Sequence, residues 1–182
     1  MKVNIRKIVL TSLMIALVFV ITYLPFLHIP SPVPPGYFNI GDAVIMIAAI
    51  LLGRRAGMLA GAFGAALADL AFGAFIFVPI TFVVKGIEGY VVGAIAHRKK
   101  GQKANNSRRV IAVAVGALII VAGYFLLELT FYRMIDNTLA VAAIISEIPG
   151  NLVQGGVSAV IAYIFIAILD KTKVFKKFKQ EI

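Results

Sequence analysis

Six apolar segments, most of them long enough to cross a lipid bilayer, constrain the fold of this chain more than any other feature. The 182 residues are 61% hydrophobic and only 14% charged, whereas soluble domains carry about 25% charged residues. A helix needs about 20 apolar residues to cross the hydrocarbon core, so we predict membrane-spanning helices at residues 8–27, 41–53, 56–77, 80–96, 110–131 and 149–169. The second segment is short for a span. The predicted fold class is an all-α integral membrane protein, a single six-helix bundle over residues 1–182.

Positive charges indicate how these spans are oriented. Of the 18 Lys and Arg residues, all but Lys85 and Arg133 lie in four patches, at residues 2–7, 54–55, 98–109 and 171–179. Lys and Arg favour the cytoplasmic side of a membrane, and six spans place all four patches on one side. We therefore expect a multi-pass protein of the bacterial plasma membrane with both termini in the cytoplasm. The net charge of +10 is then explained by this bias and by attraction to the lipid bilayer. It does not need a nucleic-acid partner as its explanation.

The fourth predicted span carries two charges, Lys85 and Glu88. Each charge near the middle of a span costs about 2.5–3.5 kcal/mol on insertion scales. Thr81, Lys85 and Glu88 are spaced i, i+4 and i+7, which places them in one polar stripe. The stripe is either an ion pair that only holds the bundle together or part of a binding site. Intramembrane ionisable residues are functional by default, so the binding site is favoured, although Lys85 could be the permanent partner of Glu88 or Asp69.

Other polar residues are expected at the same depth, in the outer half of the membrane. Tyr124, Glu128 and Tyr132 share one face of the fifth span. A second stripe on the sixth span contains Glu147, Asn151, Gln154 and Ser158. We predict a pocket that opens to the outside under the proline-rich loop at residues 28–39. The candidate substrate-binding residues are Lys85, Glu88, Glu128, Tyr132, Asn151, Gln154, Tyr124, Asp69, Tyr37 and Asn39.

Structural interpretations stay open for some polar residues of this region, namely Asp42, Asp69, Tyr124, Tyr132, Asn151 and Gln154. The two aspartates could cap or pair, the tyrosines could belong to an interfacial aromatic belt, and the amides could link helices. Acidic groups outnumber basic groups in the outer region, which disfavours a strongly anionic ligand. A small polar heterocycle held by hydrogen bonds, such as one with a basic nitrogen, fits better.

Several kinds of catalytic site are excluded by missing residues. The chain has no cysteine, which removes disulfides, thiolate metal sites and cysteine nucleophiles. The motifs G-x-x-x-x-G-K-[ST], H-E-x-x-H and G-x-S-x-G are absent, and His28 and His97 are expected on opposite sides of the membrane. We therefore expect no enzyme, no catalytic residue, no metal and no cofactor bound by this chain. An intramembrane enzyme is the least supported alternative. A stronger one is a self-contained carrier or channel, acting as a homo-oligomer and driven by an ion gradient through Glu88 or Asp69.

An ordered set of short motifs runs through the whole chain. It comprises F-N-I-G-D-A at 38–43, L-G-R-R-A-G at 52–57, A-L-A-D-L at 66–70, P-I-T-F-V-V-K-G-I-E-G at 79–89 and E-I-P-G-N-L-V-Q-G at 147–155. With its six short spans, the chain resembles the S components of energy-coupling-factor (ECF) vitamin transporters. The resemblance implies a high-affinity substrate-binding subunit that works with a transmembrane coupling protein and two ATPases, and the ATPases use the ATP.

The resemblance also implies where ligand and partner bind. Family ligands lie in the outer half, under the first outer loop and against the last three helices. Small residues on the first helix, often A-x-x-x-A, dock the coupling protein, and the nearest match here is Ser12 with Ala16, a face that could equally pack within the molecule. The implied ligand is a small water-soluble vitamin or precursor, with hydroxymethylpyrimidine and pyridoxine the first candidates and riboflavin and thiamine the alternatives.

Overall fold

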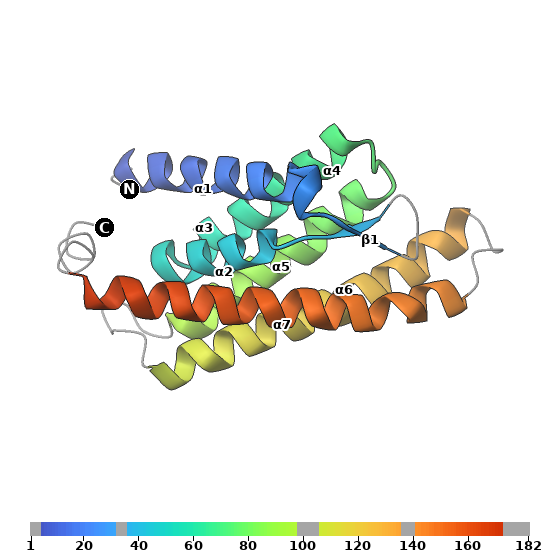
Figure 1. Cartoon of the computed structure of the whole chain (residues 1–182). Coiled ribbons are helices and arrows are strands. Elements are labelled where there is room, and N and C mark those ends of the chain that lie inside the picture. Colours follow the sequence, from blue (N-terminus) through green and yellow to red (C-terminus); the bar gives the residue numbers. More distant parts are fainter. Residues whose placement is uncertain (1–4, 32–35, 98–105, 136–140, 173–182) are drawn as a thin grey trace.

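The helices of this computed structural model form a bundle in which the long helices run roughly along one direction (Figure 1). The structure describes residues 5–31, 36–97, 106–135 and 141–172. The longer elements are α1 (Ile5–Tyr23), α2 (Gly41–Leu52), α5 (Phe77–Ala96), α6 (Asn106–Ile135) and α7 (Val141–Lys171). Between α2 and α5 the chain forms α3 (Arg54–Leu59), a π-helical turn η2 (Ala60–Ala65) and α4 (Ala66–Phe72). A short 3₁₀ turn, η1 (Pro25–Leu27), and the strands β1 (Ile29–Pro30) and β2 (Tyr37–Phe38) complete the described elements.

Five of the six predicted spans are confirmed as helices of sufficient length and apolarity. They are Ile5–Tyr23, Arg54–Phe72, Phe77–Ala96, Asn106–Phe131 and Ile144–Lys171. The second predicted span is α2, which has only 12 residues and is shorter than the roughly 20 that a straight span needs. Nearly all of α2 is buried, and Ile45 and Met46 have no exposed surface. A helix surrounded by protein is apolar on every side whether or not it crosses the membrane, so the second span stays a prediction.

Two predicted boundaries are wrong because proline was read as a helix start. The prediction placed the beginning of the sixth span at Pro149, but α7 begins at Val141 and passes through Pro149. Likewise α5 begins at Phe77, two residues before Pro79. Proline favours the first turn of a helix, yet it is also tolerated inside membrane helices, where neighbouring groups can satisfy the freed carbonyl. The extra turns of α7 carry Glu147 into the bundle.

The small residues of the third span allow the close helix packing that the sequence predicts. A Cβ atom on Gly61 would lie 2.2 Å from the backbone carbonyl oxygen of Lys85, and one on Gly64 would lie 2.7 Å from the Cβ of Val18. A Cβ on Gly89 would lie 2.1 Å from the carbonyl oxygen of Gly57. These glycines bring α5 and α1 against the segment from α3 to η2, as small residues do in membranes, where no hydrophobic effect drives helices together.

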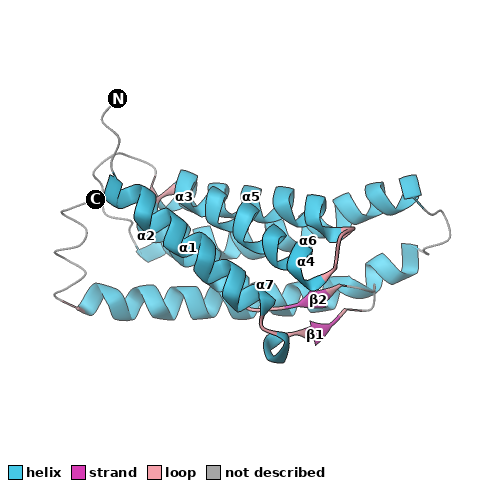
Figure 2. Ribbon diagram, turned by 90° about the horizontal axis from the view of Figure 1, so that it is seen from above, coloured by secondary structure: helices cyan, strands magenta, loops and turns pink. Residues whose placement is uncertain are grey.

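A two-stranded hairpin is an addition to the predicted all-α fold. Strands β1 and β2 pair antiparallel, with Ile29 opposite Phe38 and Pro30 opposite Tyr37. Proline favours extended backbone and lacks an N–H group, which suits this short pair. The Tyr37 ring stacks on His28 at a centroid distance of 3.9 Å. Figure 2 shows the hairpin beside the ends of α1 and α4, where it covers part of the bundle.

The start of α1 and the end of α7 lie at one end of the bundle, away from the hairpin (Figure 1). Two basic residues of the predicted cytoplasmic patches lie at this same end. Arg109 on α6 forms an ion pair with Asp170 on α7. Arg54 lies over the ring of Tyr90 with its guanidinium carbon 5.5 Å from the ring centroid. This arrangement agrees with basic patches on one side of the bundle, and the orientation of that side in the membrane stays a prediction.

Candidate functional site

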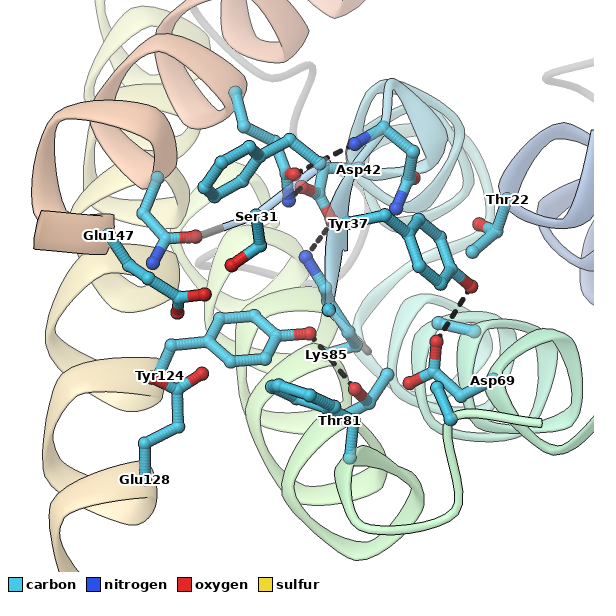
Figure 3. Close-up of a pocket in the computed structure, with 18 residues that line it drawn as sticks. Thr22, Ser31, Tyr37, Asp42, Asp69, Thr81, Lys85, Tyr124, Glu128 and Glu147 are labelled. Carbon is cyan, nitrogen blue, oxygen red and sulfur yellow. Dashed lines mark hydrogen bonds and ion pairs between the residues drawn. The ribbon is translucent and has the colours of Figure 1, made fainter. Parts of the chain in front are cut away.

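A polar pocket lies beneath the hairpin, with about 500 Å³ of empty space counting the part that is open at its mouth. Its walls come from the hairpin, α2, α5, α6, α7 and the turn region around α4 (Figure 3). The lining residues are Thr22, Ser31, Gly36, Tyr37, Phe38, Asn39, Asp42, Ala65, Asp69, Ala74, Phe77, Thr81, Lys85, Tyr124, Glu128, Glu147, Asn151 and Gln154.

Most of the predicted binding residues come together in this pocket. Those that line it are Lys85, Glu128, Asn151, Gln154, Tyr124, Asp69, Tyr37 and Asn39. Glu88 does not line it, and Tyr132 belongs to α6 with a side chain outside those that the structure describes. Ser12 and Ala16 are exposed on the surface of α1, so the alternative that they pack within the molecule is wrong.

Lys85 is neutralised by Asp42, rather than by Glu88 or Asp69. The Lys85 Nζ atom lies 2.5 Å from Asp42 Oδ1, and both side chains are almost completely buried. The amide of Gln154 donates to Asp42 Oδ2 at 2.7 Å. Its own oxygen accepts a hydrogen bond from the backbone N–H of Asn39 at 2.9 Å. This network joins α5, α2, α7 and the end of the hairpin, and it gives Gln154 the helix-linking role that the sequence left open.

Glu88 lies deeper in the bundle, behind the ion pair. Its side chain has no exposed surface, and its two oxygens have no hydrogen-bond partner among the described residues. Its Cγ would lie 3.8 Å from a Cβ on Gly116 of α6, which places the side chain between α5 and α6. Three residues advance a helix by about 4.5 Å. A shared stripe therefore does not bring Lys85 and Glu88 to the same depth.

Tyr37 connects the hairpin to α4 through Asp69. The Tyr37 hydroxyl donates to Asp69 Oδ1 at 2.7 Å, while Asp69 Oδ2 is buried and has no partner in the part of the chain that the structure describes. Burial, and then the neighbouring charge of Asp69, raise the pKa of the Tyr37 hydroxyl well above its ordinary value. The hydroxyl therefore keeps its proton and acts as a donor at physiological pH.

Tyr124 faces the pocket instead of the lipid interface. Its hydroxyl is 3.0 Å from Thr81 Oγ1, and the Lys85 Nζ atom lies 5.0 Å from the centroid of its ring. A lysine over an aromatic face is stabilised by the negative potential of the ring. The interpretation of Tyr124 as a belt aromatic does not hold, because both its ring and its hydroxyl contact residues that line the pocket.

Glu128 and Glu147 place two carboxyl groups side by side in the pocket wall (Figure 3). Glu128 on α6 is 1% exposed and Glu147 on α7 is 3% exposed. Neither oxygen of Glu128 has a hydrogen-bond partner among the described residues. In all, four lining residues are acidic and one is basic, and that one, Lys85, already pairs with Asp42. The pocket therefore offers acceptors for a ligand that carries hydrogen-bond donors or positive charge.

The family described as ECF-type riboflavin transporter, S component, matches residues 2–171 of the chain. The chain belongs to this family. It is thus the S component of a vitamin transporter, a membrane protein and not an enzyme.

Two relatives extend this result. One relative is the thiamine precursor transporter HmpT of Lactococcus lactis subsp. cremoris (strain MG1363). It is 24% identical to this chain over 177 residues, which are 97% of this chain and 95% of the relative. An uncharacterized protein of Pyrococcus woesei, from the gap 3' region, is 37% identical over 105 residues, 58% of this chain and 68% of the relative.

The sequence alone did not single out every residue that lines the pocket of this S component. Thr22 and Ser31 were not predicted at all, whereas Asp42, Thr81 and Glu147 were noted as polar residues of the region but not included among the candidate binding residues. Asp42 had the clearest signal, an acidic residue in the first turn of an otherwise apolar helix. Its partner Lys85 is 43 residues away. No local spacing connects them.

Proposed function

We propose that this S component is the substrate-binding subunit of an ATP-driven importer for a small water-soluble vitamin or vitamin precursor in the plasma membrane. The observation that carries the proposal is the polar pocket under the hairpin, in a chain of a transporter family. Ligand pockets combine apolar walls with a few well-placed polar groups. Here Phe38, Phe77 and Tyr124 supply aromatic surface beside the carboxyl groups.

For the ligand, we propose hydroxymethylpyrimidine first and pyridoxine second. The relative that aligns with nearly the whole chain is named a thiamine precursor transporter, and the excess of acidic groups suits a ring with amino or hydroxyl donors. The family description supports riboflavin as the next candidate, and thiamine is the last.

For the partners, we propose a transmembrane coupling protein and two ATPases, docked on the exposed face of α1 that contains Ser12 and Ala16. Among the five long spans, α1 has the smallest buried share, 17%. A helix with so little contact to its own bundle is free to contact another protein. ATP is hydrolysed by the partners, since the chain has no P-loop motif.

Uptake into liposomes tests this function. The purified chain is reconstituted alone or together with coupling protein, ATPases and internal ATP, and uptake of radiolabelled hydroxymethylpyrimidine is measured. We expect uptake only in the complete, ATP-loaded vesicles. Uptake by this chain alone, driven by a sodium or proton gradient, would instead support the self-contained carrier, for which Glu88 and Asp69 are the candidate ion-coupling residues.

A further inference from the structure

We propose that Glu128 and Glu147 form a carboxyl clamp that recognises an amino group next to a ring nitrogen, the edge presented by a 4-aminopyrimidine. This inference rests on the proposed function and names the chemical feature that the pocket selects. The two residues come from different helices, α6 and α7, and meet at the pocket wall (Figure 3).

Burial of the pair is the first argument. Glu128 is 1% exposed, and its two oxygens are buried without a hydrogen-bond partner in the described part of the chain. Burying a carboxyl group without hydrogen bonds costs several kcal/mol, so the fold carries an energetic cost that a suitable ligand can offset. A ligand that donates hydrogen bonds to Glu128 removes this cost on binding.

The chemistry of two neighbouring carboxyl groups is the second argument. Two negative carboxylates side by side repel each other, so the pair is more stable when one of the two carries a proton. A pair with one proton presents acceptors together with one O–H donor. A 4-aminopyrimidine presents the complementary groups, an N–H donor on the exocyclic amine and an acceptor on the adjacent ring nitrogen. If the proton of the carboxyl pair moves to the ring nitrogen, the amine and the protonated ring nitrogen both donate hydrogen bonds to the two carboxylates. The donors and acceptors of ligand and pocket then remain complementary.

The rest of the pocket disfavours other ligands. Lys85 is held by Asp42 at 2.5 Å, so it offers no free positive charge to a phosphate ester. The dione edge of a flavin would place two carbonyl oxygens against carboxyl oxygens. Pyridoxine has no exocyclic amine. The clamp therefore separates ligands with an aminopyrimidine ring, namely hydroxymethylpyrimidine and thiamine, from pyridoxine and the flavins by hydrogen-bond polarity, while the aromatic rings of Phe38 and Phe77 can contact all of them.

Two ligands that differ only at the position of the amine test the clamp. Isothermal titration of the full chain in detergent compares 4-amino-5-hydroxymethyl-2-methylpyrimidine with the same ring carrying a 4-keto oxygen. The native chain is expected to bind the amine at least about 100-fold more tightly, because a site built for hydrogen bonds strongly rejects an analogue that cannot form them. Glu128→Gln and Glu147→Gln should each reduce this preference by about tenfold or more.

Asp170→Asn is the matched control, since it makes the same carboxyl-to-amide change on α7 at the far end, where Asp170 pairs with Arg109. It should leave the preference unchanged, and circular dichroism with thermal unfolding shows whether each variant is folded. The clamp is overturned if the native chain binds both pyrimidines with equal affinity. It is also overturned if the preference for the amine is unchanged in folded Glu128→Gln and Glu147→Gln. Either result leaves the proposed transport function intact. If the native chain binds none of the candidate vitamins or precursors, both the clamp and the proposed function fail.

Discussion

At the scale of single residues, the buried pair of Lys85 and Asp42 is the main electrostatic link in the pocket. Each residue is nearly inaccessible to solvent, and Gln154 occupies the second oxygen of Asp42. A buried ion pair is not strongly stabilising relative to apolar residues, but removing one partner leaves an uncompensated charge. The pair therefore constrains how α2, α5 and α7 meet.

Replacing Lys85 by Met should destabilise the protein by about 3–5 kcal/mol, since Asp42 would be left buried and unpaired. The double variant Lys85→Met with Asp42→Asn should recover much of this loss, because neither charge remains. Thermal unfolding of the native protein, the single variants Lys85→Met and Asp42→Asn, and the double variant in one detergent measures the coupling. Equal stabilities of the native protein and Lys85→Met would show that the charge of Asp42 is compensated elsewhere.

Tyr37 has a pKa that makes a distinct prediction at high pH. Burial, followed by the charge of Asp69, raises the pKa of this hydroxyl in the folded protein. Above about pH 10, the ordinary tyrosine pKa, the unfolded chain loses this proton while the folded chain retains it. The contribution of Tyr37 to the free energy of unfolding is thus complete below pH 10 and declines as the pH rises further.

We therefore expect stability to fall less steeply above pH 10 in Tyr37→Phe than in the native protein. Denaturant unfolding at several pH values between 8 and 11 would measure the difference between the two slopes. Parallel slopes would mean that Tyr37 is not shielded in the folded protein. At neutral pH the variant should be modestly less stable, because Asp69 loses a hydrogen bond worth about 1–3 kcal/mol when its partner is removed.

At the scale of helices, the contact between α3 and α5 depends on glycine. A Cβ on Gly89 would lie 2.1 Å from the carbonyl oxygen of Gly57, and backbone atoms cannot move aside as a flexible side chain can. This contact sets the position of α5, and with it the position of Lys85 and Thr81 in the pocket. The close approach of two helix backbones is thus connected directly to the geometry of the site.

Gly89→Ala should destabilise the protein by at least about 1–3 kcal/mol, the usual range for overpacking, and should also weaken ligand binding. Gly156→Ala is the matched control, because nothing lies within 4 Å of a Cβ at that position of α7. Thermal unfolding of the two variants under the same conditions provides the comparison. Similar stabilities would show that α3 and α5 separate without cost.

At the scale of the whole molecule, the pocket and the exposed face of α1 are separate surfaces. The pocket lies under the hairpin, whereas Ser12 and Ala16 are exposed on α1 and do not line it. Ligand binding and assembly with the coupling protein should therefore respond to different substitutions.

Ala16→Phe should leave ligand affinity unchanged while preventing assembly, since a large ring would separate two closely packed helices. Co-purification with coupling protein and ATPases, together with titration of the ligand, measures the two properties independently. Val160→Phe, on a lipid-facing part of α7 that is 57% exposed, should affect neither. Loss of ligand binding in Ala16→Phe would connect this face of α1 to the pocket.

Features that depend on local composition and spacing could be predicted from the sequence. Apolar length predicted the membrane class and six spans, five of which are helices long enough to cross a membrane, and the small residues of the third span predicted its close packing. Helical periodicity also grouped Asn151 with Gln154 and Glu147 on one face of the sixth span. These features follow from neighbours along one helix, so the tertiary structure did not change them.

Which polar groups meet could not be predicted from the sequence and follows from the way the helices pack in the tertiary structure. It paired Lys85 with Asp42, placed Glu88 behind the pocket, and set Glu147 beside Glu128. It also placed α2 inside the bundle, with nearly all of its side chains buried. Each of these outcomes depends on the rotation and depth at which helices distant in the sequence pack together, and the spacing within a single helix carries no information about either.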